Sequence, residues 1–448
     1  MNYCLFIKHL FRKIFQFYYF NKMQIVYMFT FILLLNKIFL KKLTISFEKK
    51  INENLPVDGY MEELMWNNLV AKINLGTPLN STNFMIRLQT HPLILIGEDT
   101  KTKYPKYNNS KSSSFKTLNN SIIKNQFSYF IESKLSQENF KILNNNIEIK
   151  CLLTNKISNY EGIHYPGLLG LGIKENIRIE KEYEGTNFIQ QLKSYNLISS
   201  YVFTIKFHNN YKKGEIIIGE KPEEYNKNYH PEGFKQVQTE KITSSVVWSI
   251  SIDNLIVDNN TIENDVVIRL KLESGVIKPT YALQKYLENN FFIPHLSNKS
   301  CFKNRTEDFF GIYYYCNKNI DLKSFPVINF HLKPFEMNFT LTYEDLVVEY
   351  KGRYFFLFVF QDYIERFEVG YPFLKKYEFV FDQDKKIIGM YKQVKGSFSF
   401  INLMIFIFIF VIFCLLIFSV FILYKKQRRR RINEIDDNFD YFPQENLY

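Results

Sequence analysis

The sequence lacks the short motifs that bring a nucleophile, a metal ion or a phosphate group to a reaction centre. It contains no G-x-S-x-G, H-E-x-x-H or C-x-x-C spacing and no phosphate-binding glycine loop. Its seven histidines are scattered along the chain. We therefore predict no metal ion and no cofactor, and we look for chemistry in residues that lie far apart in the sequence.

Two distant pairs of segments repeat the same order of residue types. Phe84-Met-Ile-Arg-Leu88 is followed far downstream by Gly167-Leu-Leu-Gly-Leu-Gly172, and Val266-Val-Ile-Arg-Leu270 is followed by Phe367-Glu-Val-Gly370. Each half of the chain therefore has an apolar strand and, much later, an apolar-apolar-glycine turn. This is a coarse internal duplication, and no shorter repeat of solenoid type accompanies it.

The elements that carry these segments are predicted to be strands. Residues 66–395 consist mostly of short runs rich in Ile, Val, Phe, Tyr and Leu, which Asn, Gly, Lys and Ser interrupt. Helical patterns are few, chiefly around 186–196 and 279–289. The expected fold class is all-β, or mainly β.

The order of these segments resembles that of the pepsin-type (eukaryotic) aspartyl proteases. Ile73-Asn-Leu-Gly-Thr-Pro78 is similar to the family's I-x-I-G-T-P opening, and Trp248-Ser-Ile-Ser-Ile252 is similar to the strand that opens its second lobe. Pro166–Gly172 and Glu368–Asp382 are similar to its two apolar-apolar-glycine turns. The resemblance covers about residues 66–392 and implies a bilobal fold with a peptide cleft between the lobes. The domain boundaries that we expect are a leader at 1–45, a pre-segment at 46–65, an N-terminal lobe at 66–238 and a C-terminal lobe at 239–396.

The resemblance also implies where catalysis would occur. The family's reaction needs two carboxylates, one from each lobe, which share a proton and hold a water molecule. Each carboxylate belongs to an aspartate in a D-T/S-G loop. At the first loop this chain reads Gln89-Thr90-His91, so a neutral amide replaces the aspartate and a histidine replaces the glycine. Thr90 is kept, and the resemblance gives its hydroxyl the role of linking the two loops.

The second loop can be placed in two registers. Counting back from Pro279 without a gap puts Leu270 at the aspartate position. If this chain is three residues shorter than the family between the loop and Pro279, Glu273-Ser274-Gly275 instead stands in place of D-S-G. We prefer this register because it keeps the serine and the glycine. Neither register supplies an aspartate, so no catalytic residue is predicted to be intact.

The resemblance assigns further positions around the loops. The turns that support them would be Leu168-Leu169-Gly170 and Val369-Gly370, and the candidate flap residue is Tyr129, in a segment that lacks the family's flap glycines. Cys301 and Cys316 correspond to the disulfide of the second lobe, in keeping with an oxidising compartment. Seven N-x-S/T sequons in the body point to a glycoprotein; they begin at Asn80, Asn108, Asn119, Asn259, Asn298, Asn304 and Asn338.

The distribution of charge favours a membrane protein over a nucleic-acid-binding one. The net charge is +12, but residues 1–50 hold +8 of it and residues 51–424 only +3. Residues 401–424 carry no charge and are long enough to span a bilayer. Basic residues follow them at once, which predicts a cytosolic tail at 425–448. The apolar run at 25–35 is predicted to be the core of a signal peptide, with an uncleaved anchor as the alternative.

We therefore expect a single-pass type I membrane glycoprotein of the secretory pathway or cell surface, with its body in the lumen or outside. The body would be a degenerate aspartyl protease that binds an extended peptide or a protein partner through the cleft. One alternative is an unusual membrane-tethered aspartic endopeptidase. Another is a structural surface glycoprotein whose cleft has no role.

Overall fold

The computed structural model describes residues 42–391, except for residues 53, 67–68, 101–104, 120–121, 127–129, 143, 158–165, 174–184, 209–210, 243–244, 307–310 and 362–366. One compact unit, Met1–Lys392, contains the predicted N-terminal lobe and all but the last four residues of the predicted C-terminal lobe. Most of the predicted leader, the apolar run 401–424 and the tail 425–448 lie outside the described residues. Within the described part of the chain, no helix is both long enough and apolar enough to cross a membrane.

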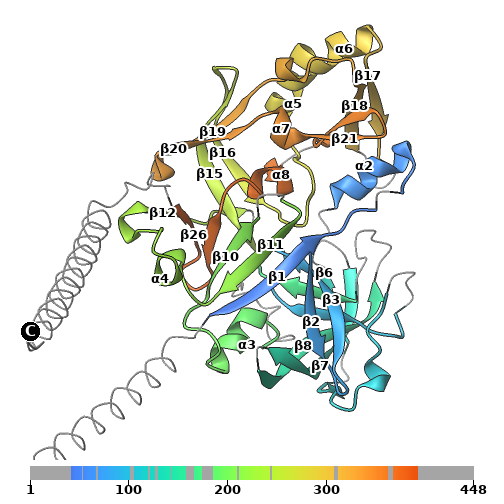
Figure 1. Cartoon of the computed structure of the whole chain (residues 1–448), viewed down its shortest axis with the longest axis vertical. Helices are drawn as coiled ribbons and strands as arrows, with labels where there is room; N and C mark the ends of the chain where they lie inside the picture. The colour runs from blue at the N-terminus through green and yellow to red at the C-terminus, as the bar shows by residue number, and fades with distance from the viewer. Residues whose placement is uncertain are drawn as a thin grey trace, which may run out of the picture. The chain divides into compact units, whose positions relative to one another are not determined.

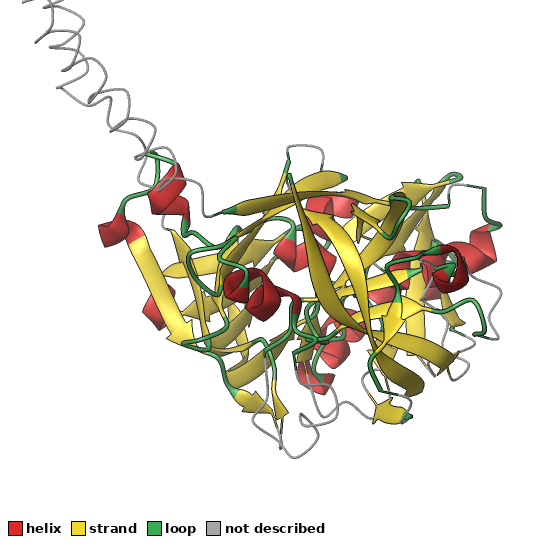
Figure 2. Cartoon of the chain, turned by 90° about the horizontal axis from the view of Figure 1, so that it is seen from below, coloured by secondary structure: helices red, strands yellow, loops and turns green. Residues whose placement is uncertain are grey.

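Strands dominate the described residues, which confirms the mainly-β prediction and is consistent with a pepsin-like fold (Figure 2). Fourteen of the strands form one sheet in the order β12-β26-β25-β10-β11-β1-β2-β3-β9-β4-β8-β7-β5, with β6 paired to β7. These strands are β1 Leu43–Lys49, β2 Leu69–Leu75, β3 Asn80–Arg87, β4 Leu93–Ile96, β5 Lys116–Thr117, β6 Ile123–Gln126, β7 Phe130–Ile142, β8 Asn145–Ile157, β9 Gly167–Gly170, β10 Val202–Phe207, β11 Lys213–Ile218, β12 Phe234–Gln238, β25 Phe379–Asp382 and β26 Ile387–Tyr391.

The second half of the chain contributes two five-stranded sheets of its own (Figure 1). One has the order β20-β19-β15-β16-β24, and the other joins β17, β18, β22 and β21, with β23 paired to β18. Their bounds are β15 Ser249–Val257, β16 Asn260–Leu270, β17 Cys301–Arg305, β18 Gly311–Asn317, β19 Ile328–Leu332, β20 Met337–Leu341, β21 Val347–Tyr350, β22 Arg353–Phe356, β23 Phe360–Gln361 and β24 Phe367–Val369. A further short pair joins β13 (Lys241–Ile242) to β14 (Ser245–Val246).

The α-helices are short and lie between the strands. Two of them, α3 and α5, fall in the stretches where the sequence predicted helix. The α-helices are α2 Val57–Met65, α3 Phe188–Ser194, α4 Pro222–Tyr225, α5 Tyr281–Leu287, α6 Ile293–Ser297, α7 Tyr343–Leu346 and α8 Tyr371–Leu374.

Alternating apolar residues explain why the strands form and which face they bury. In β1 the side chains of Leu43, Ile45 and Phe47 are buried and those of Thr44 and Ser46 are exposed, as a two-residue period requires. An aromatic cluster then joins the two halves of the chain. The ring of the fully buried Trp248 lies 6.0 Å from that of Phe203 and 5.0 Å from that of Phe381.

The predicted disulfide is confirmed. Cys301 of β17 and Cys316 of β18 are direct cross-strand partners and are bonded to each other. Cys151 is a free, buried cysteine, and burial raises the pKa of its thiol. That thiol therefore stays protonated and packs as a small apolar group.

Two predicted boundaries do not coincide with the observed elements. Residues 43–49 were expected to belong to the leader and the pre-segment, but they form β1 of the large sheet, between β11 and β2. Residues 379–391 were expected to belong to the C-terminal lobe alone, yet β25 and β26 join β10 and β12 in that same sheet. Backbone pairing thus connects the segments on either side of the predicted lobe boundary.

Candidate functional site

The first candidate loop follows β3. This strand runs parallel to β9, and its last residue, Arg87, is the register partner of Gly170. A Cβ on Gly170 would lie 2.6 Å from the carbonyl oxygens of Thr90 and Pro92, so only glycine allows the loop to pass so close. The predicted turn Leu168–Gly170 is therefore the direct support of the loop that holds Gln89.

The second candidate loop has the same construction. It follows β16, which runs parallel to β24, and Leu270 is the register partner of Val369. A Cβ on Gly370 would lie 2.2 Å from the carbonyl oxygen of Ser274 and 2.6 Å from that of Val276. The chain duplication thus extends to a parallel strand pair, a glycine and a loop folded over that glycine.

This geometry places Gln89 and Glu273 at matching positions. Gly170 touches Thr90 as Gly370 touches Ser274, so the residues just before Thr90 and Ser274 correspond to each other. The other candidate, Leu270, is the last residue of β16 and is fully buried, so it ends the strand and does not lie at the loop tip. Of the two registers that the sequence left open, the geometry favours the one with Glu273.

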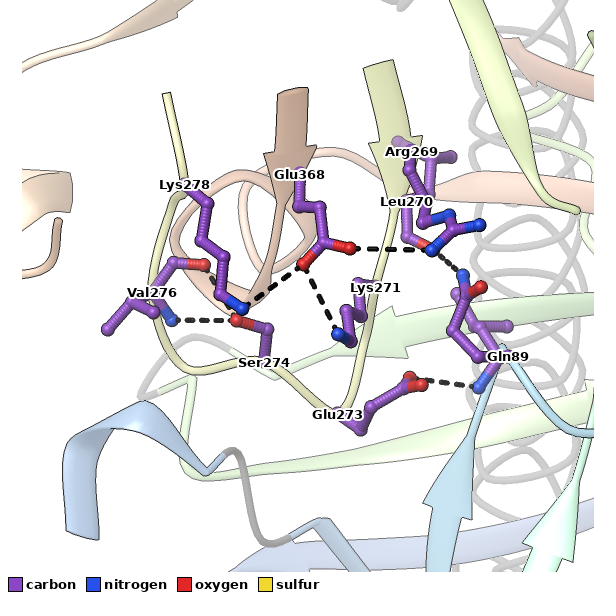
Figure 3. A network of polar contacts seen from close by, with 10 residues as sticks. Gln89, Arg269, Leu270, Lys271, Glu273, Ser274, Val276, Lys278 and Glu368 are labelled. Atoms are coloured by element: carbon purple, nitrogen blue, oxygen red, sulfur yellow. Dashed lines mark hydrogen bonds and ion pairs between the residues drawn. The ribbon is translucent and has the colours of Figure 1, made fainter. Parts of the chain in front are cut away.

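Side chains of both loops reach across to the other half of the chain (Figure 3). The Leu88 backbone N–H donates a hydrogen bond to Oε2 of Glu273 at 3.2 Å, and Nε2 of Gln89 donates one to the carbonyl oxygen of Leu270 at 2.8 Å. Glu273 is 1% exposed, and its Oε1 has no hydrogen-bond partner among the described residues. The structure therefore brings Gln89, Leu270 and Glu273 together at one place.

The link between the loops is not the one that the resemblance implied. The Thr90 hydroxyl is buried but finds no hydrogen-bond partner within the described residues. The Ser274 hydroxyl stays within its own loop and donates to the carbonyl oxygen of Val276 at 2.9 Å. The two loops are instead joined by hydrogen bonds of the longer side chains of Gln89 and Glu273.

Elements distant in sequence hold both loops in place. The Gly275 N–H donates to the carbonyl oxygen of Met65, the last residue of α2, at 2.8 Å. A Cβ on Gly275 would lie 1.7 Å from the carbonyl oxygen of Leu64, so α2 packs directly on the second loop. On the other side, Nε1 of Trp248 donates to the carbonyl oxygen of Leu171, just after the first supporting turn, at 2.9 Å.

A cluster of charges beside the second loop escaped the sequence analysis. Oε1 of Glu368 lies 3.4 Å from Nη1 of Arg269, and its Oε2 lies 3.2 Å from Nζ of Lys271 and 3.6 Å from Nζ of Lys278 (Figure 3). The four side chains are between 12% and 17% exposed. The available signal was Glu368, an acidic residue in the second supporting turn where the first turn has apolar residues.

The electrostatics of this cluster follow from burial and from the excess of cations. Burial alone would raise the pKa of Glu368, but Lys271, Lys278 and Arg269 outweigh it and lower the pKa to about 2. Burial lowers the pKa of Lys278, and so does the charge of Lys271, although Glu368 acts in the opposite direction. Glu368 is thus an ionised carboxylate that holds three cations beside the loop.

The remaining predicted site features lie only partly within the described residues. Tyr129, the candidate flap residue, lies outside the described residues. Its neighbours form a hairpin in which Gln126 of β6 pairs with Phe130 of β7. Among the residues that the structure describes, no group of three His, Cys, Asp or Glu side chains has the arrangement of a metal site.

Chemically, the matched positions offer one carboxyl group and one amide. The carboxyl group of Glu273 can gain or lose a proton, whereas the amide of Gln89 can only donate and accept hydrogen bonds. Sharing a proton between two carboxylates requires a carboxyl group at both positions. The pair can therefore hold polar groups, but its two members cannot exchange the acid and base roles.

Comparison with known proteins identifies the family to which the chain belongs. The profile of the family described as Eukaryotic aspartyl protease matches residues 94–393, about two thirds of the chain. The match begins after Gln89 and Thr90 and includes Glu273. No curated protein matches the sequence.

Proposed function

Because the chain belongs to the eukaryotic aspartyl protease family, we propose that it is a peptide-binding module that uses the family's fold without its hydrolytic chemistry. The observation that carries the proposal is the match between Gln89 and Glu273 at the two loop positions. In the family's reaction one carboxylate takes a proton from water while the other gives a proton to the substrate. An amide at one of the two positions removes one of these roles.

The contacts at the loops support the same proposal. Gln89 uses its amide N–H to bind the carbonyl oxygen of Leu270, and Glu273 accepts a hydrogen bond from the Leu88 N–H. Both side chains are therefore engaged in holding the loops together, as structural residues are. Loss of chemistry leaves the packed β-structure intact, because activity depends on the site and not on the fold.

The proposed ligand is an extended peptide or a protein segment that lies between the lobes. Such a ligand pairs its backbone with strand edges and places alternate side chains in pockets, which gives affinity without bond cleavage. We further propose a single-pass type I topology, with residues 401–424 in the membrane and the body in the lumen or outside the cell. The uncharged run and the basic residues that follow it support this topology.

The proposal is tested first by assaying proteolysis. The full-length protein, purified in detergent micelles, is incubated with an unfolded protein substrate across the acidic pH range. We expect no cleavage and no binding of a transition-state-mimicking aspartic protease inhibitor. Cleavage that Gln89→Ala and Glu273→Ala both abolish would show that an amide and a carboxyl group can perform the reaction, and it would overturn the proposal in favour of a membrane-tethered endopeptidase.

Binding is tested separately with a displayed library of random peptides. The wild-type protein should enrich a subset of peptides, and Gln89→Trp, which places a large ring at the first loop, should lose that enrichment. Lys285→Met, a change at an exposed position on α5, is the matched control and should retain it. Equal retention by both variants would mean that the loops have no role in capture, as in a structural glycoprotein.

A further inference from the structure

The sheet formed by β17, β18, β22 and β21 has one face that is only partly covered. Helix α2 packs on this face, where the ring of Tyr60 stacks on that of Tyr350 at 3.6 Å and meets that of Phe355 at 5.4 Å (Figure 1). The apolar cluster around α2 reaches Tyr315 of β18, but among the described residues it does not include Phe302 of β17. Phe302 is 36% exposed. An aromatic ring is thus left at the margin of the covered face.

A row of rings across the sheet ends at Phe302. Phe302 and Tyr315 are cross-strand partners, and their rings stack with centroids 5.2 Å apart and an interplanar angle of 21°. The Tyr315 ring stacks in turn on that of Phe355 at 5.6 Å, and the Arg353 guanidinium lies 4.8 Å from its centroid. β17 is the edge strand, so within the described part of the chain no strand covers the side of Phe302 that faces away from Tyr315. The row therefore ends in an apolar surface that is open to solvent.

Asn304 lies next to this surface, on the same face of β17. Side chains two positions apart on a strand point to the same side. Asn304 is also the cross-strand partner of Tyr313, and its Nδ2 donates a hydrogen bond to the Tyr313 hydroxyl at 3.0 Å. The amide nitrogen has two protons, so this bond uses one of them and leaves the other to be replaced. Because Asn304-Arg305-Thr306 is an N-x-S/T sequon, the replacing group is a sugar.

Asn304 differs from the other six sequon asparagines in the residue two positions before it. That residue is the aromatic Phe302, whereas none of the other six is aromatic: they are Pro78, Lys106, Thr117, Val257, Leu296 and Glu336. Phe302 and Asn304 are about 7 Å apart along the strand, which is within reach of the first sugar of a glycan. The C–H groups on one face of a pyranose are apolar and slightly positive, and they suit the negative face of an aromatic ring.

We propose that Asn304 carries an N-linked glycan whose first sugar, N-acetylglucosamine, packs on the open side of the Phe302 ring. In the transfer, Nδ2 of Asn304 forms a bond to C1 of the sugar, and the bond from C1 to the diphosphate of a lipid-linked donor breaks. The lipid diphosphate leaves with the electron pair, and one amide proton is released. The sugar would also protect the free edge of β17 from pairing with another chain. The inference relies on the proposed luminal body but uses no residue of the loops around Gln89 and Glu273, so it goes beyond peptide binding.

The first test measures whether Asn304 is modified. The full-length protein, expressed in cultured mammalian cells, is treated with peptide N-glycosidase in heavy-oxygen water, which converts each glycosylated asparagine into a labelled aspartate. Mass spectrometry should find the label at position 304 in most molecules. An unlabelled Asn304 beside a labelled Asn80 or Asn338 would overturn this inference alone. A protein without label at any sequon would overturn the proposed topology together with it.

The second test measures the packing of the sugar on the ring. Phe302→Leu, Asn304→Gln and the double variant form a cycle, whose unfolding in urea is followed by pulse proteolysis. The two changes should not add, because each removes the same contact. We expect a coupling of about fivefold in the equilibrium constant for unfolding, since covering roughly half of the exposed ring area gives about that factor. Protein trimmed by endoglycosidase to one N-acetylglucosamine per site should keep the coupling.

Two controls separate the sugar from other causes. Protein from tunicamycin-treated cells has no sugars, so its cycle should show no coupling. The cycle of Phe302→Leu with Asn80→Gln should be additive, because Asn80 is an exposed sequon residue at the start of β3, in the other half of the chain. Additivity at Asn304 in the glycosylated protein would overturn the packing of the sugar. Coupling that persists in the sugar-free protein would also overturn it, since Phe302 and Asn304 would then interact directly.

Discussion

Gln89 and Glu273 differ in the property on which the family's reaction depends, the ability to exchange a proton. A carboxyl group at position 89 would restore that property, but it would restore neither the aspartate of the second loop nor the glycine at position 91. We expect Gln89→Asp to leave the protein without proteolytic activity, because the partner is a glutamate whose Oε2 is already bound to the Leu88 N–H. Cleavage of an unfolded protein substrate by the single variant, measured on gels at acidic pH, would contradict this expectation.

A triple variant, compared with Gln89→Asp, restores the family's residues in both loops. Gln89→Asp with His91→Gly and Glu273→Asp recreates D-T-G and D-S-G on supporting turns whose glycines are present at 170 and 370. A trace of cleavage by this triple variant, together with none by Gln89→Asp, is the expected pattern. The activity should stay low, because Glu368 and its cations occupy the second supporting turn.

Glu368 sets a second expectation at the scale of a residue, this time for stability. Its pKa is about 2 in the folded protein and roughly 4.3 in an unfolded chain. A lowered pKa stabilises the folded state fully above the unfolded value, and the contribution disappears as the pH falls through about 2. We therefore expect Glu368→Gln to lower the free energy of unfolding by about 3 kcal/mol near neutral pH and by much less in strong acid.

The measurement is urea unfolding of the full-length protein at a series of pH values. Glu349→Gln is the control, because Glu349 pairs with Lys318 at the surface, where both side chains are 51% exposed. An exposed pair contributes at most about 1 kcal/mol. If Glu368→Gln and Glu349→Gln had equal effects at every pH, the cluster would have no special role in stability.

At the scale of elements, α2 acts as a support for the second loop. Gly275→Ala would place a methyl group 1.7 Å from the carbonyl oxygen of Leu64, and backbone cannot move aside as a flexible side chain can. We expect a loss of stability of about 1–3 kcal/mol or more, measured by thermal unfolding. Gly59→Ala, within α2, is the matched control. Its Cβ would have no neighbour closer than 3.7 Å, so it should stabilise the helix by roughly 0.5–1 kcal/mol.

The β17–β18 pair gives a second expectation at this scale. The disulfide closes a loop with a sequence separation of 15, so replacing both cysteines by serine should lower stability by about 3 kcal/mol. Reductant should lower the unfolding temperature of the wild-type protein to that of the variant and leave the variant unchanged. A wild-type protein that is insensitive to reductant under unfolding conditions would contradict this reasoning.

The elements also show how far the sequence could lead. The strand-rich pattern, the two supporting turns and the Cys301–Cys316 pair were visible because each has a short local signature. The sequence favoured the Glu273 register of the second loop because that register keeps Ser274 and Gly275, but it left Leu270 open, because a three-residue difference in loop length changes no local pattern. The contact between Gly370 and Ser274, which favours Glu273, joins residues 96 positions apart.

The same reason explains what was missed. Glu368 lies 99 residues from Arg269 and 97 from Lys271, so no local sequence pattern indicates that these side chains are in contact. Strand β1 was assigned to a leader and a pre-segment because it follows a long basic and apolar start. Its place in the large sheet depends on β11, whose residues come much later in the chain.

At the scale of the whole molecule, the charge distribution predicts the orientation in the membrane. Residues 425–431 hold six basic residues directly after the uncharged run 401–424, and basic residues beside a span stay on the cytosolic side. In sealed microsomal vesicles, added protease should therefore remove an epitope tag placed after Tyr448 and leave the body protected. Protease added with detergent should reach sites on both sides, which is the control for vesicle integrity.

The basic residues themselves are tested by neutralising them. Replacing Lys425, Lys426 and Arg428–Arg431 by asparagine would remove the charge that we propose keeps the tail in the cytosol, so a larger fraction of molecules should show a protected tag and a digested body. Fusing a strong cleavable signal sequence in front of residue 42, so that β1 stays whole, should restore the original orientation in this variant, because the start of the body would then be committed to the lumen. A wild-type protein with a protected tail and a digested body would reverse the topology. It would also place the Cys301–Cys316 disulfide in a compartment that disfavours disulfides.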